Sequence, residues 1–254
     1  MIRFLTLFFF WLCFLCREER PTIFIIGDST VKAGKGLGEN GMWGWGSVID
    51  EHFDTSKIKI ENHAIGGRSS RTFLTDGRWE PILEKMKEGD FLLIQFGHND
   101  DWAINDTIRA RGTINGIGDE TEEIDNLLTH KHEVVHTYGW YLKKYATEAK
   151  QKGVEVFICS QVPFNRFENG KVAALTKNYP IWAAEIAEIT DSHFIDLQKT
   201  VSKNYNQLNY NLVKQRYFTA KDDVHTNLEG AKLNAYYVVK GIHSSKSPLK
   251  KFLK

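Results

Sequence analysis

Short apolar runs recur along the chain and alternate with stretches whose apolar positions repeat every three or four residues. The runs are rich in β-branched and aromatic residues, which is typical of buried strands. The stretches between them have the period of an amphipathic helix. Strands are predicted at Thr22–Ile26, Lys57–Glu61, Phe91–Phe96, Val154–Cys159 and His193–Leu197. Helices are predicted at Trp79–Glu88, Thr137–Gln151, Tyr179–Ile189 and Asn227–Lys240.

This alternation predicts one α/β domain. Continuous apolar strands separated by helices are typical of a parallel sheet that is covered on both faces. Gly89 and Gly153 stand where helices should end ahead of strands. The irregular stretch from Trp102 to Glu133 breaks the pattern, so we expect a functional rim loop there, with a decorative loop as the alternative. No repeat or interdomain linker is evident.

The first residues form a segment of a different kind. A basic residue precedes an apolar run over Phe4–Leu15, and charged residues follow at Arg17–Arg20. The run is too short to span a bilayer comfortably and is typical of a signal-peptide core. We interpret residues 1–20 as a signal peptide or lipoprotein leader and residues 21–254 as the folded domain. Secreted or periplasmic localisation is expected, with lipid anchoring through Cys16 as the alternative.

Composition narrows the choice of partners. The chain has 254 residues and a formal net charge of +1, so it offers no electrostatic case for nucleic acid or an anionic membrane. The basic tail from about His243 is expected to be a frayed, solvated end. Cys159 is the only cysteine beyond the leader. We expect it to be a buried strand residue and not a nucleophile, because no basic partner is suggested nearby.

Polar blocks beside the predicted strands carry the candidate chemistry. In an open parallel sheet, active residues gather at the carboxyl ends of the strands. The backbone N–H groups of Ser29 and Gly67 and the side chain of Asn99 are therefore expected to meet and to form an oxyanion hole. A helix N-cap is the alternative interpretation of Ser29. The blocks are Gly27–Thr30, Gly66–Ser69, Gly97–Asp100 and Asp222–His225.

The last block supplies an acid and a base. Asp222 and His225 are three positions apart, so a short loop can hold the carboxylate against one ring nitrogen while the other nitrogen faces Ser29. His225 would then take the serine proton, and Asp222 would orient and stabilise the imidazolium. Asp223 is the rival acid, although we interpret it as a solvated turn residue. The chain lacks Gly-x-Ser-x-Gly, so the nucleophile elbow of the α/β-hydrolases is not predicted.

In these blocks the chain resembles the SGNH (GDSL-like) hydrolases, with Thr30 in place of the more usual leucine. Additional motifs are similar to those of rhamnogalacturonan acetylesterases, which remove acetyl groups from pectic sugars. The resemblance runs from about Phe24 to Ala235, so residues 21–254 are interpreted as a single SGNH hydrolase domain. The additional motifs are Gly41–Gly46, Asn62–Ala64, Gly66–Phe73, Gly77–Trp79, Gln95–Asp100 and His136–Tyr141.

The resemblance has consequences for fold and function. It implies a three-layer α/β/α sandwich with a flavodoxin-like, roughly five-stranded parallel sheet. It implies a serine carbohydrate esterase acting on an acetylated pectic polysaccharide or oligosaccharide, with another glycan such as xylan as the alternative. No cofactor, metal or obligate protein partner is predicted. The resemblance also supports a catalytic triad of Ser29, Asp222 and His225, and an oxyanion hole of Ser29, Gly67 and Asn99.

Aromatic and basic residues near these motifs are candidates for substrate binding. Trp43, Trp45 and Trp79 can stack on sugar rings. Arg68, Arg71 and Arg78 can pair with uronate carboxylates. A place in the core is the alternative for each tryptophan. Ion pairing within the loop is the alternative for the arginines, and for Arg68 we prefer it.

A competing motif points to a different class of enzyme. His132, Glu133 and His136 match the His-Glu-x-x-His pattern of zinc metalloproteases. The extended form of that motif needs a third histidine where this chain has Leu142. Because zinc with two protein ligands would be poorly held, a metalloprotease is the distant alternative. A carbohydrate-binding protein with an inactive site is disfavoured, because every catalytic position is filled.

Overall fold

A five-stranded parallel sheet forms the centre of the protein. The computed structural model describes residues 19–35, 37–174 and 177–254. The strand order is β2–β1–β3–β6–β9, which is the flavodoxin-like arrangement. The predicted fold is therefore confirmed. The strands are β1 (Thr22–Gly27), β2 (Lys59–Asn62), β3 (Phe91–Gln95), β6 (Glu155–Cys159) and β9 (His193–Ile195).

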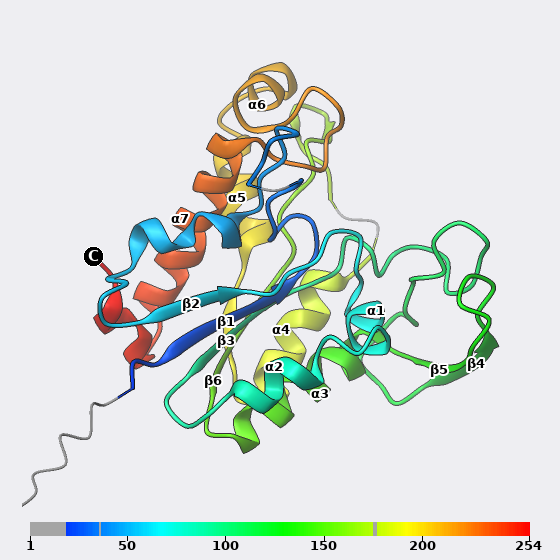
Figure 1. Cartoon of the computed structure of the whole chain (residues 1–254). Helices are drawn as coiled ribbons and strands as arrows, with labels where there is room; N and C mark the ends of the chain where they lie inside the picture. The colour runs from blue at the N-terminus through cyan, green and yellow to red at the C-terminus, as the bar shows by residue number, and fades with distance from the viewer. Residues whose placement is uncertain (1–18, 36, 175–176) are drawn as a thin grey trace, which may run out of the picture.

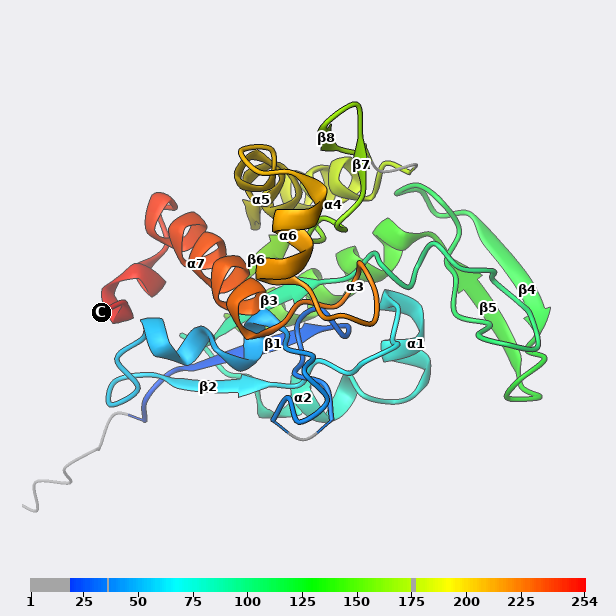
Figure 2. The ribbon, with the colours of Figure 1, turned by 90° about the horizontal axis from the view of Figure 1, so that it is seen from above.

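Helices cover both faces of this sheet and make three layers (Figures 1 and 2). One face packs against α1 (Ser70–Thr75), α2 (Glu80–Lys85), α3 (Tyr138–Gln151) and α4 (Tyr179–Ile189). The other packs against α5 (Leu197–Tyr205), α7 (Leu228–Ser244) and the 3-10 turns η1 (Trp45–Ser47) and η2 (Ile49–His52). Helix α6 (Tyr210–Tyr217) adds a smaller cluster with α5.

The continuous apolar strands follow from this sandwich. Successive side chains of a strand point to opposite faces. Phe24 and Ile26 of β1 accordingly lie in the core under α3, whereas Ile23 and Ile25 lie in the core under α7. Burial on both sides removes apolar surface from water at every position of the strand, which explains why the run has no polar alternation.

Local signals explain most helix boundaries. Thr137 and Asn227 cap α3 and α7, because each side chain accepts a hydrogen bond from the first turn. Gly153 has a φ of 76° and ends α3 directly before β6, as predicted. Helix α2 ends earlier than expected, and α7 continues beyond Lys240. The sequence did not predict α1, α5 or α6.

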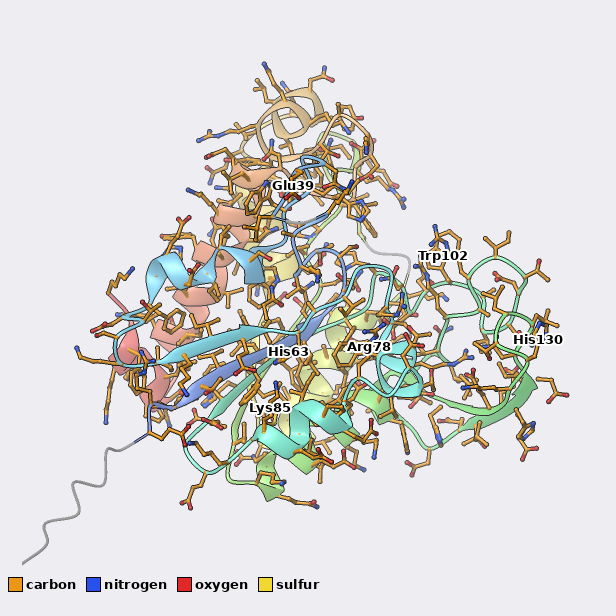
Figure 3. The ribbon with its side chains drawn as sticks, viewed as in Figure 1. Glu39, His63, Arg78, Lys85, Trp102 and His130 are labelled. Carbon is orange, nitrogen blue, oxygen red and sulfur yellow. The ribbon has the colours of Figure 1, made fainter. Side chains whose placement is uncertain are left out.

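The segment Trp102–Glu133, expected to be irregular, contains a strand. Strand β4 (Thr121–Asp125) pairs antiparallel with β5 (His132–His136). This hairpin stands away from the central sheet as an arm, with His130 at its tip (Figures 1 and 3). Its strands are mostly exposed and polar, so they lack the apolar run by which the buried strands were recognised. A further short hairpin joins β7 (Phe167–Glu168) to β8 (Lys171–Val172).

The C-terminal tail is ordered, and the prediction of a frayed end is wrong. It forms the 3-10 helix η3 (Pro248–Phe252), in which Leu249 is fully buried. The Phe252 ring packs edge-on against Phe91, and Leu253 forms a β-bridge with Phe53. These apolar contacts hold the segment against the sheet, while its lysines remain at the surface.

Two further predictions concern the N-terminal leader and Cys159. Most of the predicted leader, including Cys16, lies outside the described residues. Among the described residues, no helix has the length and apolarity needed to cross a membrane. Cys159 is buried in β6, and burial raises the pKa of its thiol far above the ordinary value. The expectation of an inert strand cysteine is therefore confirmed.

Candidate active site

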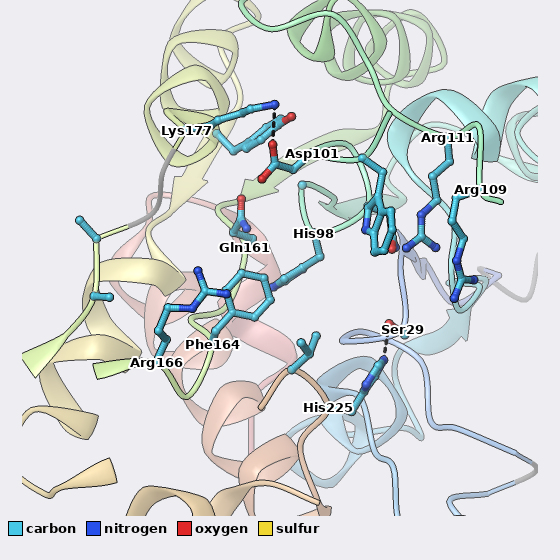
Figure 4. Close-up of a pocket in the computed structure, with 17 residues that line it drawn as sticks. Ser29, His98, Asp101, Arg109, Arg111, Gln161, Phe164, Arg166, Lys177 and His225 are labelled. Atoms are coloured by element: carbon cyan, nitrogen blue, oxygen red, sulfur yellow. Dashed lines mark hydrogen bonds and ion pairs between the residues drawn. The ribbon is translucent and has the colours of Figure 1, made fainter. Parts of the chain in front are cut away.

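The turn after β1 meets the loop before α7 at the hydroxyl of Ser29. His225 Nε2 lies 3.0 Å from Ser29 Oγ, and His225 Nδ1 lies 2.9 Å from Asp222 Oδ2. With its proton on Nδ1, the ring donates to the carboxylate and accepts from the serine hydroxyl. Figure 4 shows His225 directed at Ser29. No helix begins at Ser29, so the N-cap interpretation is wrong, and the geometry is that of a nucleophile beside an oriented base.

The loop that carries His225 is held by short hydrogen bonds. Asp222 Oδ1 accepts the backbone N–H of Val224 at 2.9 Å and that of His225 at 2.7 Å. Thr226 Oγ1 donates to the carbonyl of Trp43 at 2.7 Å. Burial alone would raise the pKa of Asp222, but the hydrogen bonds from His225 and Val224 outweigh it and hold that pKa below its ordinary value. The acid is therefore ionised at neutral pH.

The neighbouring acid points elsewhere. Asp223 accepts from Asn165 Nδ2 at 3.0 Å and from the Tyr210 hydroxyl at 3.2 Å, and it pairs with Lys214 Nζ at 3.1 Å. It ties α6 to the loop after β6. Our interpretation of Asp223 as a solvated turn residue is therefore corrected, because its carboxylate is a local anchor.

Amide groups suited to an oxyanion hole surround the serine. An ideal Cβ at Gly66 would lie 3.7 Å from Ser29 Cβ, so the glycine turn lies against the nucleophile. Gly67 has a φ of 77°, a conformation that favours glycine. Within the described chain, neither the Ser29 nor the Gly67 backbone N–H donates to another residue. Asn99 Nδ2 donates to the Arg68 carbonyl at 2.9 Å, which leaves its second hydrogen available.

A cavity of about 430 Å³ opens beside Ser29, His225 and Asn99. Its wall is rich in cationic side chains, as the close-up in Figure 4 shows. Lys177 pairs with Asp101 at 2.5 Å. Within the part of the chain that the structure describes, no carboxylate lies within ion-pair distance of the three arginines of the wall. These arginines are Arg109, Arg111 and Arg166.

Aromatic rings support the arginines. The Arg111 guanidinium lies 4.8 Å from the centre of the Trp102 ring, and that of Arg109 lies 5.8 Å from it. Arg166 lies 5.6 Å from the Phe164 ring. Burial and the neighbouring Arg109 lower the pKa of Arg111 to about 10, so it remains charged at neutral pH. The cavity therefore presents a cationic wall next to the nucleophile.

Comparison with known proteins agrees with this geometry. A model of the GDSL-like Lipase/Acylhydrolase family matches residues 25–233. The chain belongs to this family. It is accordingly a carboxylic ester hydrolase of the type that uses serine, histidine and aspartate.

Curated relatives and solved structures are similar over most of the chain. A rhamnogalacturonan acetylesterase of Emericella nidulans is 30% identical, over 87% of this chain and 84% of the relative. A rhamnogalacturonan acetylesterase of Bacillus subtilis is 29% identical, over 86% of this chain and 83% of the relative. A solved Bacillus subtilis protein has a TM-score of 0.70 at 22% identity, covering 88% of this chain and 56% of its own. The structure of an acetylxylan esterase of Geobacillus stearothermophilus has a TM-score of 0.60 at 18% identity, and the match covers 89% of this chain and 95% of that protein. The two structures support the fold.

The tryptophans predicted to stack on sugar do not line the cavity of this GDSL-like hydrolase. Trp45 and Trp79 are each 0% exposed. Their indole N–H groups donate to Gln95 Oε1 at 2.8 Å and to Glu148 Oε2 at 2.6 Å. The prediction is wrong for both, because no ring face is open to a ligand. Trp43 is partly buried against the α7 core and lies outside the cavity, so its assignment to substrate stays a prediction.

Arg71 is also a structural residue, and its assignment to substrate is wrong. Its side chain is 0% exposed and pairs with Glu133 at 2.6 Å. It also donates to the carbonyls of Ile104 and Gly112, which anchors the arm to α1. Arg68 pairs with Asp76 at 2.6 Å, which confirms the preferred interpretation of that residue.

The zinc motif forms a strand, and this overturns the metalloprotease alternative. A strand rises about 3.3 Å per residue, which separates the backbones of His132 and His136 by about 13 Å. Glu133 lies between them in β5, and its carboxylate pairs with Arg71. The described residues contain no group of three or more histidine, cysteine, aspartate or glutamate side chains that could hold a metal.

Sequence reasoning found the catalytic residues of the cavity but missed the aromatic and basic side chains of its wall. The one available signal was position, because Trp102, Arg109 and Arg111 fall within the irregular segment that we expected to rim the site. Trp102 is 47% exposed and stands where the arm begins (Figure 3). Nothing in the sequence distinguished Arg166 from an ordinary loop residue.

Proposed function

We propose that the protein is a serine acetylesterase that removes O-acetyl groups from an acidic, uronate-containing polysaccharide of the rhamnogalacturonan type. The single observation that carries this proposal is the cationic wall beside Ser29. Its three guanidinium groups, on Arg109, Arg111 and Arg166, have no carboxylate partner in the described chain. The similarity to curated rhamnogalacturonan acetylesterases supports the same substrate class.

The charge of the cavity distinguishes acidic from neutral glycans. A guanidinium binds a carboxylate through two parallel donors, and this pairing is stronger than a neutral hydrogen bond. A uronate residue next to the acetylated sugar would supply such a carboxylate. A neutral xylan backbone would leave the guanidiniums without an anionic partner. We therefore favour a pectic substrate over xylan.

The proposed reaction proceeds through an acetyl-enzyme. Ser29 Oγ attacks the acetyl carbonyl carbon while His225 Nε2 accepts the hydroxyl proton. The Ser29 and Gly67 amides and Asn99 donate to the developing oxyanion. His225 then returns the proton to the sugar oxygen, which leaves as a free hydroxyl. A water activated by His225 hydrolyses the acetyl-serine and releases acetate.

Acetate release from matched polymers tests the substrate. We expect acetylated rhamnogalacturonan to be hydrolysed with a higher kcat/KM than acetylated xylan. A rhamnogalacturonan whose uronate carboxyls have been reduced to alcohols, with its acetyl groups retained, is the matched control and should be a poor substrate. Equal rates on the native and reduced polymers, or a preference for xylan, would contradict the proposal.

Two arginine variants sharpen this test. Arg109→Gln and Arg166→Gln each remove one charge from the wall without removing a side-chain hydrogen bond to another described residue. A hydrogen bond to a charged group contributes about 1.5–3 kcal/mol, so each variant should lose about tenfold to a hundredfold in kcat/KM on the acidic polymer. Hydrolysis of 4-nitrophenyl acetate should be unaffected. Arg78→Gln, which lies outside the cavity and pairs with Asp76, is the control.

Export of the protein is a separate proposal. The apolar run at Phe4–Leu15 supports a secretory leader, and Cys16 supports lipid attachment as the alternative. Mass spectrometry of the protein isolated from its native host distinguishes the two. A cleaved, unmodified N-terminus indicates secretion, and a diacylglycerol mass on Cys16 indicates anchoring. A full-length, unmodified chain contradicts both.

A further inference from the structure

A second histidine–carboxylate pair lies beside the proposed triad. His98 Nδ1 is 3.1 Å from Asp28 Oδ2, and His98 Nε2 is 2.9 Å from the carbonyl oxygen of Val162. The two side chains are 4% and 0% exposed. Asp28 immediately precedes Ser29, and His98 immediately precedes Asn99. The pair therefore joins the backbone at the nucleophile to the backbone at the proposed oxyanion donor.

The hydrogen-bond partners determine where most of the protons lie. A carbonyl oxygen can only accept, so His98 Nε2 carries a hydrogen. Asp28 Oδ1 accepts the backbone N–H and the hydroxyl of Thr30, each at 2.8 Å. The Thr30 hydroxyl itself accepts from Gln95 Nε2 at 2.6 Å, so its hydrogen is directed at Asp28. A carboxylate with two donors on one oxygen is well suited to remain ionised.

The proton between His98 and Asp28 therefore belongs to the histidine. Burial alone would lower the pKa of His98, but the adjacent Asp28 carboxylate outweighs it and raises that pKa. Burial alone would raise the pKa of Asp28, but His98 and Thr30 outweigh it and lower that pKa. The two directions agree with the pattern of donors and acceptors.

The other groups around the pair are compatible with this assignment. Asp100, in the loop after β3, accepts from Ser70 and from the Gly97 N–H, and burial raises its pKa to about 7. Any negative charge that it carries favours a protonated His98. Arg111 contributes a positive charge that favours ionised Asp28. The loop after β6 contributes the Val162 carbonyl and the edge of the Phe164 ring, whose centre is 5.2 Å from that of His98.

We propose that His98 is a positioning residue that stays doubly protonated and neutralises Asp28 throughout ester hydrolysis. An unpaired carboxylate one residue from Ser29 would oppose the negative charge that develops on the oxyanion. Water screens such repulsion weakly at a buried site. The pair also fixes the ends of β1 and β3 relative to one another. This proposal rests on the role of Ser29 given above, but the protonation state of His98 can be measured without any substrate.

Nitrogen NMR of the intact protein tests the protonation state. We expect the His98 ring of the wild type to show two protonated nitrogens at about pH 8, above the ordinary histidine pKa of about 6.5. The signal is assigned by its absence from His98→Gln. Asp28→Asn should convert the ring to the neutral form, because the new amide can donate to Nδ1. A neutral His98 ring in the wild type at that same pH would overturn the proposal.

A set of charge variants tests whether neutralisation of Asp28 by His98 affects catalysis, with 4-nitrophenyl acetate as the substrate. Gln at position 98 can still donate to the Val162 carbonyl, but it leaves Asp28 without its counter-charge. We expect His98→Gln to lower kcat about a hundredfold with little change in KM. Removing the unpaired charge of Asp28 in the double variant His98→Gln/Asp28→Asn should restore at least about tenfold of that loss. A purely structural role predicts the opposite, a double variant slower than His98→Gln.

The controls separate this inference from other failures. His193 pairs with Glu155 at 2.7 Å on the edge strand β9, far from Ser29 in sequence and outside the cavity, so His193→Gln should keep its kcat. The aryl acetate carries no sugar, so a failure of the proposed polysaccharide does not affect this assay. If His98→Gln does not fold, sequential assignment from the backbone identifies the His98 ring signals, and the wild-type and Asp28→Asn spectra still decide the protonation state. A Ser29→Ala variant that retains activity would refute the proposed mechanism and the catalytic part of this inference, but not the spectra.

Discussion

Two histidine–aspartate pairs lie within this site. They differ in the group that faces the second nitrogen of the histidine ring. In the His225–Asp222 pair, the second ring nitrogen faces a hydroxyl, and the side chains are 26% and 34% exposed. In the His98–Asp28 pair, the second nitrogen faces a carbonyl, and the side chains are 4% and 0% exposed. A hydroxyl can give up its proton and a carbonyl has none. The same two residue types therefore make a proton acceptor in one place and a fixed charge in the other.

The difference shows that a histidine–carboxylate pair does not by itself identify a general base. The base is identified by what stands on the far side of the ring and by access to the cavity. His225 meets both conditions, because it faces Ser29 and lines the cavity. His98 also borders the cavity, yet both of its nitrogens are occupied by acceptors of the protein. The following predictions test this contrast in order of decreasing effect.

Removing the hydroxyl should have the largest effect. Ser29→Ala leaves the His225 ring in place but removes the group that it deprotonates, so we expect turnover to fall on the order of a millionfold, as in other triads. The spectrum of His98 should not change. Both are measured on a preparation whose thermal unfolding matches the wild type. Retention of most esterase activity would show that another nucleophile operates.

The orienting acid should come next. Asp222→Asn keeps the side-chain shape but favours the wrong His225 tautomer, which lowers turnover about 10⁴-fold in a comparable triad. Asp223→Asn should be mild, because Asp223 pairs with Lys214 and not with His225. Steady-state kinetics on an aryl acetate compares the two variants directly. A larger loss in Asp223→Asn would show that the loop is registered one residue differently in solution.

The oxyanion donor should have a smaller effect. Loss of one such donor typically lowers turnover about 10²–10³-fold, and we expect this for Asn99→Ala with little change in KM. The variant also loses the hydrogen bond to the Arg68 carbonyl, so the melting temperature should drop. Turnover and melting temperature are measured on the same sample. A destabilised variant with full turnover per folded molecule would mean that Asn99 only holds the loop.

The pH dependence of stability should show the smallest effect, and Asp222 and His98 should contribute to it with opposite signs. The folded state lowers the pKa of Asp222 from its ordinary 3.8, so its contribution to stability is present above that pH and is lost as pH falls through the lower folded value. The folded state raises the pKa of His98 from its ordinary 6.5, so that contribution is present below pH 6.5 and is lost as pH rises through the folded value.

The melting temperatures of the wild type, Asp222→Asn and Asp28→Asn, measured across pH, test these signs. The wild type should melt at a higher temperature than Asp222→Asn, and this difference should shrink on acidification below about pH 4. The melting-temperature difference between the wild type and Asp28→Asn, whose His98 lacks a carboxylate, should also shrink on the alkaline side, in addition to an acid-side loss from the lowered pKa of Asp28 itself. The Asp222 effect is modest, because that side chain is one-third exposed and water screens it. A pH-independent difference for both variants would contradict the assigned shifts.

Local sequence predicted the elements that bury their whole length. Strands β1, β3 and β6 are continuous apolar runs, and a parallel sheet with helices on both faces is the arrangement that buries such runs. The Asp222–His225 spacing was equally readable, because both residues lie in one loop and their contact needs no other segment. Ser29 and Asn99 were found because the ends of parallel strands meet at one edge.

Long-range packing decided the rest. The strand β5 depends on pairing with β4, and Arg71 is buried because Glu133, 62 positions away, neutralises it. Trp45 and Trp79 could not be separated from surface tryptophans by their local pattern, since only the elements that close over them make them core. Asp28 and His98 are 70 positions apart, and the chain by itself does not reveal that they meet. The sequence by itself determined the buried strands of the sheet, its longer helices and the chemistry that the loop Asp222–His225 can perform. The tertiary structure decided which charges are paired and which face the cavity, because pairing and burial depend on residues that only folding brings together.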